Sequence, residues 1–169
     1  KNLNLKVKFR ESFRPFAPSI LADDVSEWFE IDRPSPYMLL VANVAHSIKR
    51  EMSDSEDKLF GIEKLNVVRS KIPSVTHVDY SARVQTVHYE TNPRYYDLLK
   101  SFKNKTGCPV LINTSFNVRG EPIVASAVDA FKCFMGTNLD ALVINDFILI
   151  KKNQKESLKE DYRNKYKLD

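Results

Sequence analysis

The chain has 169 residues, of which 43% are hydrophobic and 28% charged, and its formal net charge at pH 7 is +4. This length and composition suit an ordinary globular domain and exclude a disordered, collagen-like or coiled-coil chain. The longest apolar runs, at residues 109–112 and 147–150, are far too short to cross a bilayer, so we expect no membrane partner. The chain begins without Met in the middle of a pattern, which indicates a fragment.

Residues 5–10 alternate apolar side chains with basic ones, a period of two that predicts a strand buried on one face. Lys8 and Arg10 would then share the polar face of this strand, about 7 Å apart. The prolines that follow exclude a regular helix, and residues 20–21 are expected to continue as a strand.

The next segments carry weaker patterns. Asp23 or Asp24 is expected to cap a short helix over residues 25–30. Residues 37–50 are apolar, and their periodicity leaves open whether they form a strand or a helix. Residues 51–58 are polar and acidic, which predicts a mobile surface loop.

The second half of the chain alternates strand and helix patterns. Residues 82–89 are rich in β-branched and aromatic side chains, which predicts a strand. Asn92 and Pro93 form a typical helix start, and Gly107 is expected to end that helix. Residues 109–113 then read as a short buried strand.

Ser126 is expected to cap a second helix. The apolar segments 141–144 and 147–150 flank an Asn-Asp pair and predict a β-hairpin with a two-residue turn. These elements predict a mixed α/β (α+β) fold over residues 1–151, in which helices flank a mixed β-sheet. Residues 152–169 are expected to form a charged, helical tail.

A cluster of short polar side chains follows the strand predicted at 109–113. Its members are Asn113, Thr114, Ser115, Asn117 and Arg119. Because α/β sheets place ligands at the ends of strands, this cluster is a candidate binding loop. The alternative is a capped turn whose side chains satisfy their own backbone.

Three cations, Lys8, Arg10 and Arg14, lie close together near the start of the chain. Arginine binds phosphate bidentately and lysine binds it as a compact charge, so this group suits a triphosphate. The alternative is a solvated basic face.

A third polar group comprises His77, Asp79, Arg83 and Gln85. Arg83 is flanked by apolar residues in a predicted strand, so it needs an anionic partner from the protein or from a ligand. His77 and Asp79 suggest a catalytic pair because histidine titrates near neutral pH. A histidine that is satisfied by local hydrogen bonds is the commoner arrangement.

The chain has four glycines and no glycine-rich phosphate loop, so side chains would have to hold a nucleotide. Two cysteines and three histidines without a CxxC motif do not favour a zinc site, and no metal ligand is predicted. Cys108 and Cys133 lie in apolar surroundings, which predicts buried, reduced thiols and a cytoplasmic location.

The NodU and CmcH carbamoyltransferase family, which includes the tobramycin carbamoyltransferase, resembles this chain in four ordered segments: RESFRPFAPSIL, HVDYSARVQTV, NPRYY and PVLINTSFNVRGEPIV. The resemblance runs from about Val7 to Lys151 and implies a YrdC-like twisted mixed sheet, similar to that of threonylcarbamoyl-adenylate synthases. In that wider group a KxR pair and an SxN pair mark the nucleotide site. Lys8-Phe9-Arg10 and Ser115-Phe116-Asn117 match these two pairs.

The resemblance implies an O-carbamoyltransferase that works in two steps. This domain would bind ATP and carbamoyl phosphate and form carbamoyl-adenylate, with release of pyrophosphate and phosphate. An actin-like N-terminal domain, absent from this sequence, would then transfer the carbamoyl group to a hydroxyl of a sugar or other small acceptor. Mg²⁺ is expected with the nucleotide, and iron or another metal only in the missing domain.

By the same resemblance, the candidate catalytic residues are Lys8, Arg10 and Arg83. The candidate nucleotide-binding residues are Lys8, Arg10, Arg14, Arg83, Asn113, Thr114, Ser115, Asn117 and Arg119. Family members typically carry a further Gly- and Arg-containing segment upstream of the part seen here. We therefore expect the isolated domain to be weak or inactive.

Two other functions stay open at this level. One is an RNA-binding module, since YrdC-like folds offer a broad basic concavity. RNA recognition usually adds exposed aromatic side chains, and here the aromatic residues mostly fall on core-facing positions, so nucleic acid is a disfavoured partner. The other is a purely structural domain that docks on its partner half.

Overall fold

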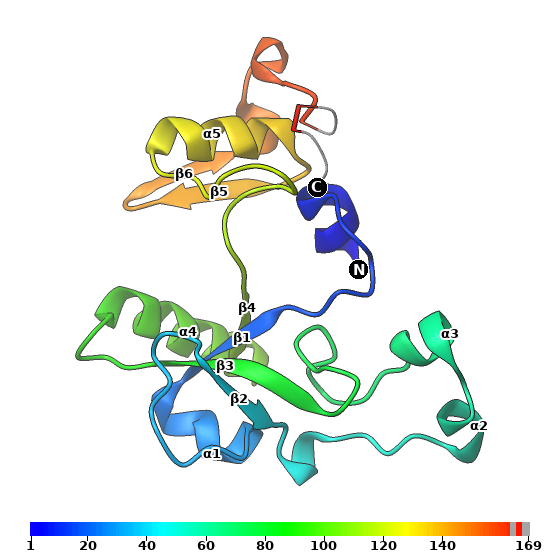
Figure 1. The fold of residues 1–169 in the computed structure, drawn as a ribbon. Coiled ribbons are helices and arrows are strands. Elements are labelled where there is room, and N and C mark those ends of the chain that lie inside the picture. The colour runs from blue at the N-terminus through cyan, green and yellow to red at the C-terminus, as the bar shows by residue number, and fades with distance from the viewer. Residues whose placement is uncertain (163–164, 167–169) are drawn as a thin grey trace. The chain divides into compact units, whose positions relative to one another are not determined.

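The computed structural model describes residues 1–162 and 165–166 and divides into two compact units (Figure 1). The first, Pro15–Thr114, is called the sheet unit below. The second combines Lys1–Arg14 with Ser115–Asp169 and is called the hairpin unit.

The sheet unit contains strands and helices in the order β1 (Ala17–Leu21), α1 (Val25–Trp28), β2 (Leu40–Asn43), α2 (Asp54–Asp57), α3 (Gly61–Leu65), β3 (Ser81–Val87), α4 (Pro93–Thr106) and β4 (Val110–Asn113). The hairpin unit contains α5 (Ala127–Gly136), β5 (Ala141–Ile144) and β6 (Phe147–Ile150). Short 3₁₀ turns lie at Ala22–Asp24, His46–Ile48, Lys151–Asn153 and Glu156–Leu158.

The sheet of the first unit is mixed, with strand order β2-β3-β1-β4. β1 runs parallel to β3, and Ser19 pairs with Gln85. β4 pairs antiparallel with β1, and β2 pairs antiparallel with β3. All five residues of β1 are buried, as expected for a central strand. The structure therefore confirms the mixed α/β class, with helices flanking the sheet.

Helix α4 packs on this sheet through Leu99, which is fully buried against Leu21 and Val87. Its start is as predicted, because the Asn92 side chain accepts a hydrogen bond from the Tyr95 N–H at 3.2 Å. Its end is also as predicted, since Gly107 adopts the left-handed conformation with φ of 76°.

Helix α5 lies along the β5–β6 hairpin in the second unit (Figure 1). Its buried residues Ala130, Phe134 and Met135 form a core with Leu142 of β5. Ser126 caps the helix by accepting the Asp129 N–H at 3.1 Å, as the sequence predicts. The hairpin is also confirmed.

The strand predicted at residues 5–10 is wrong. The segment forms a π-helical turn at Asn4–Lys8, and Phe9 ends it in the left-handed conformation with φ of 50°. The buried positions are Asn4, Val7 and Lys8, which follow a helical spacing, whereas Leu5 is 49% exposed. The period of two is therefore coincidental, and Lys8 and Arg10 do not share a strand face.

Two predictions between residues 23 and 58 also fail. Helix α1 forms, but Asp24 makes no capping bond, because its carboxylate binds Lys103 of α4 at 2.6 Å. The expected loop at 51–58 contains α2, which begins with a capping box between Ser53 and Glu56. The ambiguous stretch 37–50 forms the edge strand β2 and a 3₁₀ turn.

The charged tail, predicted to be helical, is described in part. Over 152–162 and 165–166 it contains short 3₁₀ turns and no α-helix. The rest of that prediction falls at 163–164 and 167–169, outside the described residues.

Cys133 is buried, Cys108 is partly buried, and both are free thiols. Within the described part of the chain, no helix is long and apolar enough to span a membrane.

Candidate functional site

Lys8 holds the loop that follows β4 in sequence. Its Nζ atom donates to the backbone carbonyls of Ser115 and Asn117, both at 2.7 Å, and to Asn117 Oδ1 at 2.9 Å. Lys8 is only 5% exposed, so its ammonium group is withdrawn from water and satisfied by these oxygens. The structure thus brings together Lys8, Ser115 and Asn117, the residues that match the KxR and SxN pairs.

Asn117 is fixed on both sides of its amide group. Its Oδ1 atom accepts hydrogen bonds from Lys8 and from the Ser115 hydroxyl, the latter at 2.7 Å. Its Nδ2 atom donates to the Glu121 carbonyl at 2.7 Å. Among the residues that the structure describes, the backbone N–H groups of Ser115, Phe116 and Asn117 have no acceptor. These N–H groups are therefore available to donate to a ligand.

The buried side chain of Glu121 supports the same loop. Its Oε2 atom accepts the Val118 N–H at 2.8 Å, closing a turn in which Gly120 has φ of 76°. Neither the KxR nor the SxN pair points to Glu121, and sequence reasoning missed it. The available signal was a carboxylate beside glycine and proline in a segment already chosen as a binding loop.

Arg10 and Arg14 are held near Lys8 by Asn4, which is 1% exposed. Arg10 Nε donates to Asn4 Oδ1 at 2.7 Å, and Asn4 Nδ2 donates to the Arg14 carbonyl at 2.7 Å. Asn4 was not predicted as a site residue, because it was placed just outside a strand. In the structure it orients one arginine and fixes the backbone of the other.

The cations of this group perturb one another. Burial lowers the pKa of Lys8 from its ordinary 10.5 to about 8, and the Arg10 charge adds to the shift. Burial likewise lowers the pKa of Arg10, followed by the charge of Arg14. An anion bound here would relieve this repulsion, so the electrostatics favour a negatively charged ligand.

Arg119 lies in the same unit but has an acidic neighbour. Its Nη1 atom lies 3.4 Å from Glu11 Oε1, and its backbone N–H donates to the Lys8 carbonyl at 3.1 Å. This backbone bond ties the loop to the N-terminal segment. The predicted residue is therefore in place, with its charge partly offset.

The other predicted site residues, Arg83, Asn113 and Thr114, belong to the sheet unit. Arg83 is exposed on β3, opposite Val41 of the edge strand. Its guanidinium group has no hydrogen-bond or ion-pair partner among the described residues. The expected protein or ligand anion for Arg83 is thus not supplied by this part of the chain.

Asn113 is held by Gln85. The Gln85 Oε1 atom accepts from Asn113 Nδ2 and from the Ser19 hydroxyl, both at 2.6 Å, and its Nε2 atom donates to the Pro36 carbonyl at 3.0 Å. Gln85 therefore links β3 to β1 and β4 across the face of the sheet. The sequence drew attention to Gln85 as a polar residue in an apolar strand but gave it no role.

His77 and Asp79 shape a turn rather than a catalytic pair. Asp79 Oδ1 accepts hydrogen bonds from the Ser81 N–H at 3.0 Å and from the Ser81 hydroxyl at 2.7 Å. These bonds lower the pKa of Asp79 and lock its carboxylate at the start of β3. The His77 ring makes no hydrogen bond to the described residues, so the locally satisfied histidine given as the alternative is not seen.

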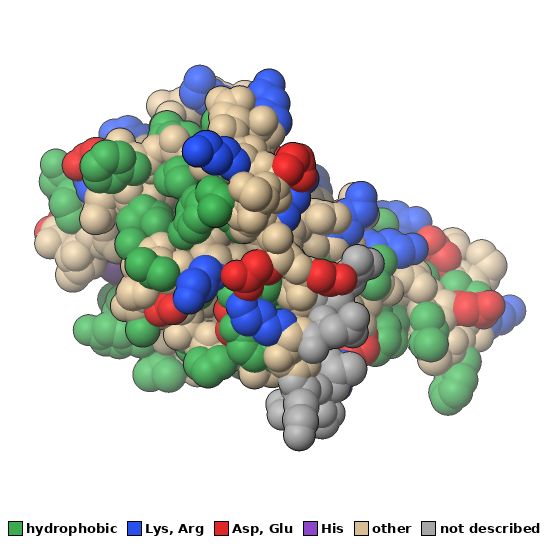
Figure 2. Space-filling model, turned by 90° about the horizontal axis from the view of Figure 1, so that it is seen from above, with side chains coloured by type: hydrophobic (Ala, Val, Ile, Leu, Met, Phe, Trp, Pro, Cys, Tyr) green, Lys and Arg blue, Asp and Glu red, His purple; other side chains and the backbone are tan. Residues whose placement is uncertain are grey.

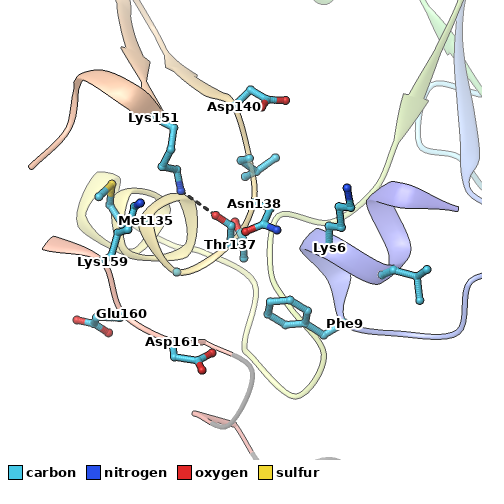
Figure 3. Close-up of a pocket in the computed structure, with 13 residues that line it drawn as sticks. Lys6, Phe9, Met135, Thr137, Asn138, Asp140, Lys151, Lys159, Glu160 and Asp161 are labelled. Atoms are coloured by element: carbon cyan, nitrogen blue, oxygen red, sulfur yellow. Dashed lines mark hydrogen bonds between the residues drawn. The ribbon is translucent and has the colours of Figure 1, made fainter. Parts of the chain in front are cut away.

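A separate cavity of about 690 Å³ lies within the hairpin unit (Figure 3). Lys6 and Phe9 line one side, and residues 159–161 of the tail line another. Lys151 points toward the end of α5, where its Nζ atom donates to the Thr137 carbonyl at 2.8 Å. The lysine charge is thus used to cap a helix.

No group of three or more His, Cys, Asp or Glu side chains assembles in the described part of the chain. Figure 2 shows Lys and Arg side chains interspersed with acidic and apolar ones on the face it presents.

Aromatic side chains are less buried than the sequence predicts. Tyr37 is 81% exposed, Phe60 92% and Phe147 73%.

The family described as Carbamoyltransferase C-terminus matches residues 1–151. An uncharacterized protein of Synechocystis sp. is 59% identical over 152 residues, which cover 90% of this chain and 25% of that protein. The nodulation protein NolO of Bradyrhizobium diazoefficiens is 42% identical over 153 residues, 89% of this chain and 24% of NolO.

A third relative is the 3'-hydroxymethylcephem-O-carbamoyltransferase of Amycolatopsis lactamdurans. It is 33% identical over 141 residues, which cover 83% of this chain and 23% of that enzyme. The chain thus spans about a quarter of the length of these relatives.

Proposed function

Because this chain belongs to the family of carbamoyltransferase C-terminal domains, as its resemblance to NodU and CmcH predicts, we propose that it is the nucleotide-binding part of an O-carbamoyltransferase. It binds ATP and carbamoyl phosphate and forms carbamoyl-adenylate. The observation that carries the proposal is the contact of Lys8 with Ser115 and Asn117, which unites the KxR and SxN pairs in one unit.

The reaction balances in two stages. Water cleaves carbamoyl phosphate to carbamate and inorganic phosphate. A carbamate oxygen then attacks the α-phosphorus of ATP, and pyrophosphate leaves with the electron pair of the broken P–O bond. The second stage brings together carbamate and ATP, two anions that repel each other, so positioning and charge stabilisation supply the catalysis.

The residues of the hairpin unit have distinct roles in this scheme. Arg10 and Arg14 supply positive charge to the phosphates. The N–H groups of Ser115, Phe116 and Asn117 donate to phosphate oxygens. Lys8 holds the conformation of this loop through its hydrogen bonds to the loop oxygens and adds its positive charge to the site. Mg²⁺ enters with the nucleotide, bound by the phosphates.

The sheet-unit residues keep their predicted roles as part of the proposal. Arg83, whose guanidinium has no partner among the described residues, binds a phosphate group. Asn113, oriented by Gln85, and the adjacent Thr114 offer further hydrogen bonds to substrate. These roles rest on the family resemblance, since Arg83, Asn113 and Thr114 lie in the other unit.

The acceptor follows from the relatives. One relative is named for a hydroxymethylcephem and others for nodulation, so the carbamoyl group passes to a hydroxyl of a small molecule or sugar. By the family resemblance, a separate actin-like domain would carry out this transfer, with its own iron or other metal. The reaction takes place in the cytoplasm, where ATP and carbamoyl phosphate are made.

A thermal-shift titration tests the binding step. ATP and carbamoyl phosphate should each raise the Tm of the wild-type chain and should raise that of Lys8→Met much less. Pyrophosphate release that requires carbamoyl phosphate would then report the chemistry. The proposal is ruled out if neither compound changes the Tm of the wild type. It is also ruled out if the compounds raise the Tm of the wild type and of Lys8→Met equally.

A further inference from the structure

The C-terminal tail folds back onto helix α5. Tyr162 is 2% exposed and packs against Val118 and Cys133. Gly136, the last residue of α5, lies directly beneath the Tyr162 ring, and a Cβ atom built on it would overlap three ring carbons. The helix therefore has a glycine at the position where the tail tyrosine docks.

Tyr166 extends this contact toward the candidate site. Its ring packs edge-on against Tyr162, with centroids 5.5 Å apart and planes at 69°. Its hydroxyl donates to Glu121 Oε1 at 3.2 Å. Burial of Tyr162, with the neighbouring Tyr166 and Glu121, raises the pKa of the Tyr162 phenol, so this ring remains neutral at physiological pH.

Glu121 connects the tail to the binding loop. One carboxylate oxygen accepts from Tyr166 and the other from the Val118 N–H at 2.8 Å. The Glu121 carbonyl accepts from Asn117 Nδ2 at 2.7 Å, which turns Asn117 Oδ1 toward Lys8. Glu121 thus joins Tyr166, bound to its carboxylate, and Asn117, bound to its backbone carbonyl, within one residue.

We propose that Tyr162 and Tyr166 are positioning residues for the nucleotide site, acting through Glu121 on the direction of the Asn117 side chain. Both tyrosines lie outside residues 1–151, the part that matches the family, so no family role covers them. The tail also forms one wall of the 690 Å³ cavity in Figure 3, through residues 159–161. The expected effect of the two tyrosines on nucleotide binding rests on the proposed function.

Tyr166→Phe tests the relay because it removes only the hydroxyl that donates to Glu121. Loss of one hydrogen bond of ordinary strength predicts amide exchange of Val118 that is roughly fivefold faster. The side-chain NH₂ resonances of Asn117 should also shift, whereas those of the exposed Asn138 should not. Tyr37→Phe, at an exposed site of the sheet unit, is the matched control. Unchanged Val118 exchange and Asn117 resonances would overturn the proposal.

Gly136→Ala tests the docking contact through the sign of its effect. A helical Gly→Ala change is ordinarily stabilising. We expect it to lower the Tm of the wild type, because the new Cβ displaces Tyr162, and to raise the Tm in a Tyr162→Ala background. A rise in both backgrounds would show that the tail does not dock here.

ATP titration separates this inference from the proposed function. Tyr166→Phe should weaken ATP binding about fivefold, in line with the lost hydrogen bond, and Tyr37→Phe should leave it unchanged. If wild type binds no ATP, the proposed function fails, while the exchange and Tm measurements still decide the positioning role. If wild type and Tyr166→Phe bind ATP equally, the positioning role fails and the proposed function stands.

Discussion

The ammonium group of Lys8 lies 2.9 Å from Oδ1 of Asn117, although the two residues are 109 positions apart in the sequence. Lys8 donates its N–H groups to loop oxygens and so shapes the Ser115–Asn117 loop. Its role toward phosphate stays a prediction, in which its charge acts at short range.

Lys8→Met is the first test of this role. The change keeps most of the side-chain volume but leaves the carbonyls of Ser115 and Asn117 without their donor. We expect a loss of about 1–3 kcal/mol in the free energy of unfolding, measured in urea. Lys6→Met is the control, since Lys6 is exposed two residues earlier. Equal stability of the two variants would contradict the role of Lys8 as a loop anchor.

The pH dependence of stability offers a second test. The pKa of Lys8 is about 8 in the folded chain and near 10.5 when unfolded, so the unfolded chain binds more protons between these values. The free energy of unfolding should therefore rise from pH 8 to 10.5, relative to Lys8→Met, and the difference should be constant below pH 8. A pH-independent difference across this window would show that the pKa of Lys8 is not lowered.

The local elements were predictable where short-range signals decide them. Asn92 with Pro93, Gly107 and Ser126 each satisfy helix ends through their own chemistry, so α4 and α5 begin as expected. The turn at Asn4–Lys8 was not predictable, because the three alternating apolar side chains of residues 5–10 imitate a strand while burial follows a helical spacing. Burial of a lysine is a tertiary property that periodicity does not reveal.

The candidate site was predicted by residue type rather than by contact. Lys8, Ser115 and Asn117 were chosen together through the family motifs, and their direct contact depends on the fold bringing distant segments together. Glu121 was missed, and Gln85 was noted without a role, because the importance of both lies in hydrogen bonds that only the fold creates. The role of the tail tyrosines could not be predicted, since nothing in the sequence of residues 152–169 indicates where the tail packs.

Arg83→Gln separates a structural arginine from one that binds ligand. Its side chain is exposed and has no partner among the described residues, so the variant should unfold at the same temperature as the wild type. ATP affinity should nevertheless fall about tenfold, the scale of one charge-assisted contact to phosphate. Lys100→Gln, on the exposed face of α4, is the control. Unchanged affinity in Arg83→Gln would remove Arg83 from the site.

The Ser19–Gln85–Asn113 network predicts strong coupling between side chains. Gln85→Met leaves the fully buried Ser19 hydroxyl and Asn113 Nδ2 without their acceptor, at an expected cost of about 1–3 kcal/mol. Ser19→Ala in the Gln85→Met background should cost less than it does alone. A double-mutant cycle in urea measures this difference. Additive effects would mean that the network contributes nothing beyond its separate parts.

Calorimetric titration with ATP is the most direct measurement for the wild type and the Asn117→Ala variant, with Asn138→Ala as the matched control. The account predicts that wild type and Asn138→Ala bind with the same affinity, and that Asn117→Ala binds at least tenfold more weakly, because the loop loses its link to Lys8. Equal affinity of all three proteins, or no binding by any of them, would contradict the central claim that Lys8 and the Ser115–Asn117 loop form a nucleotide site.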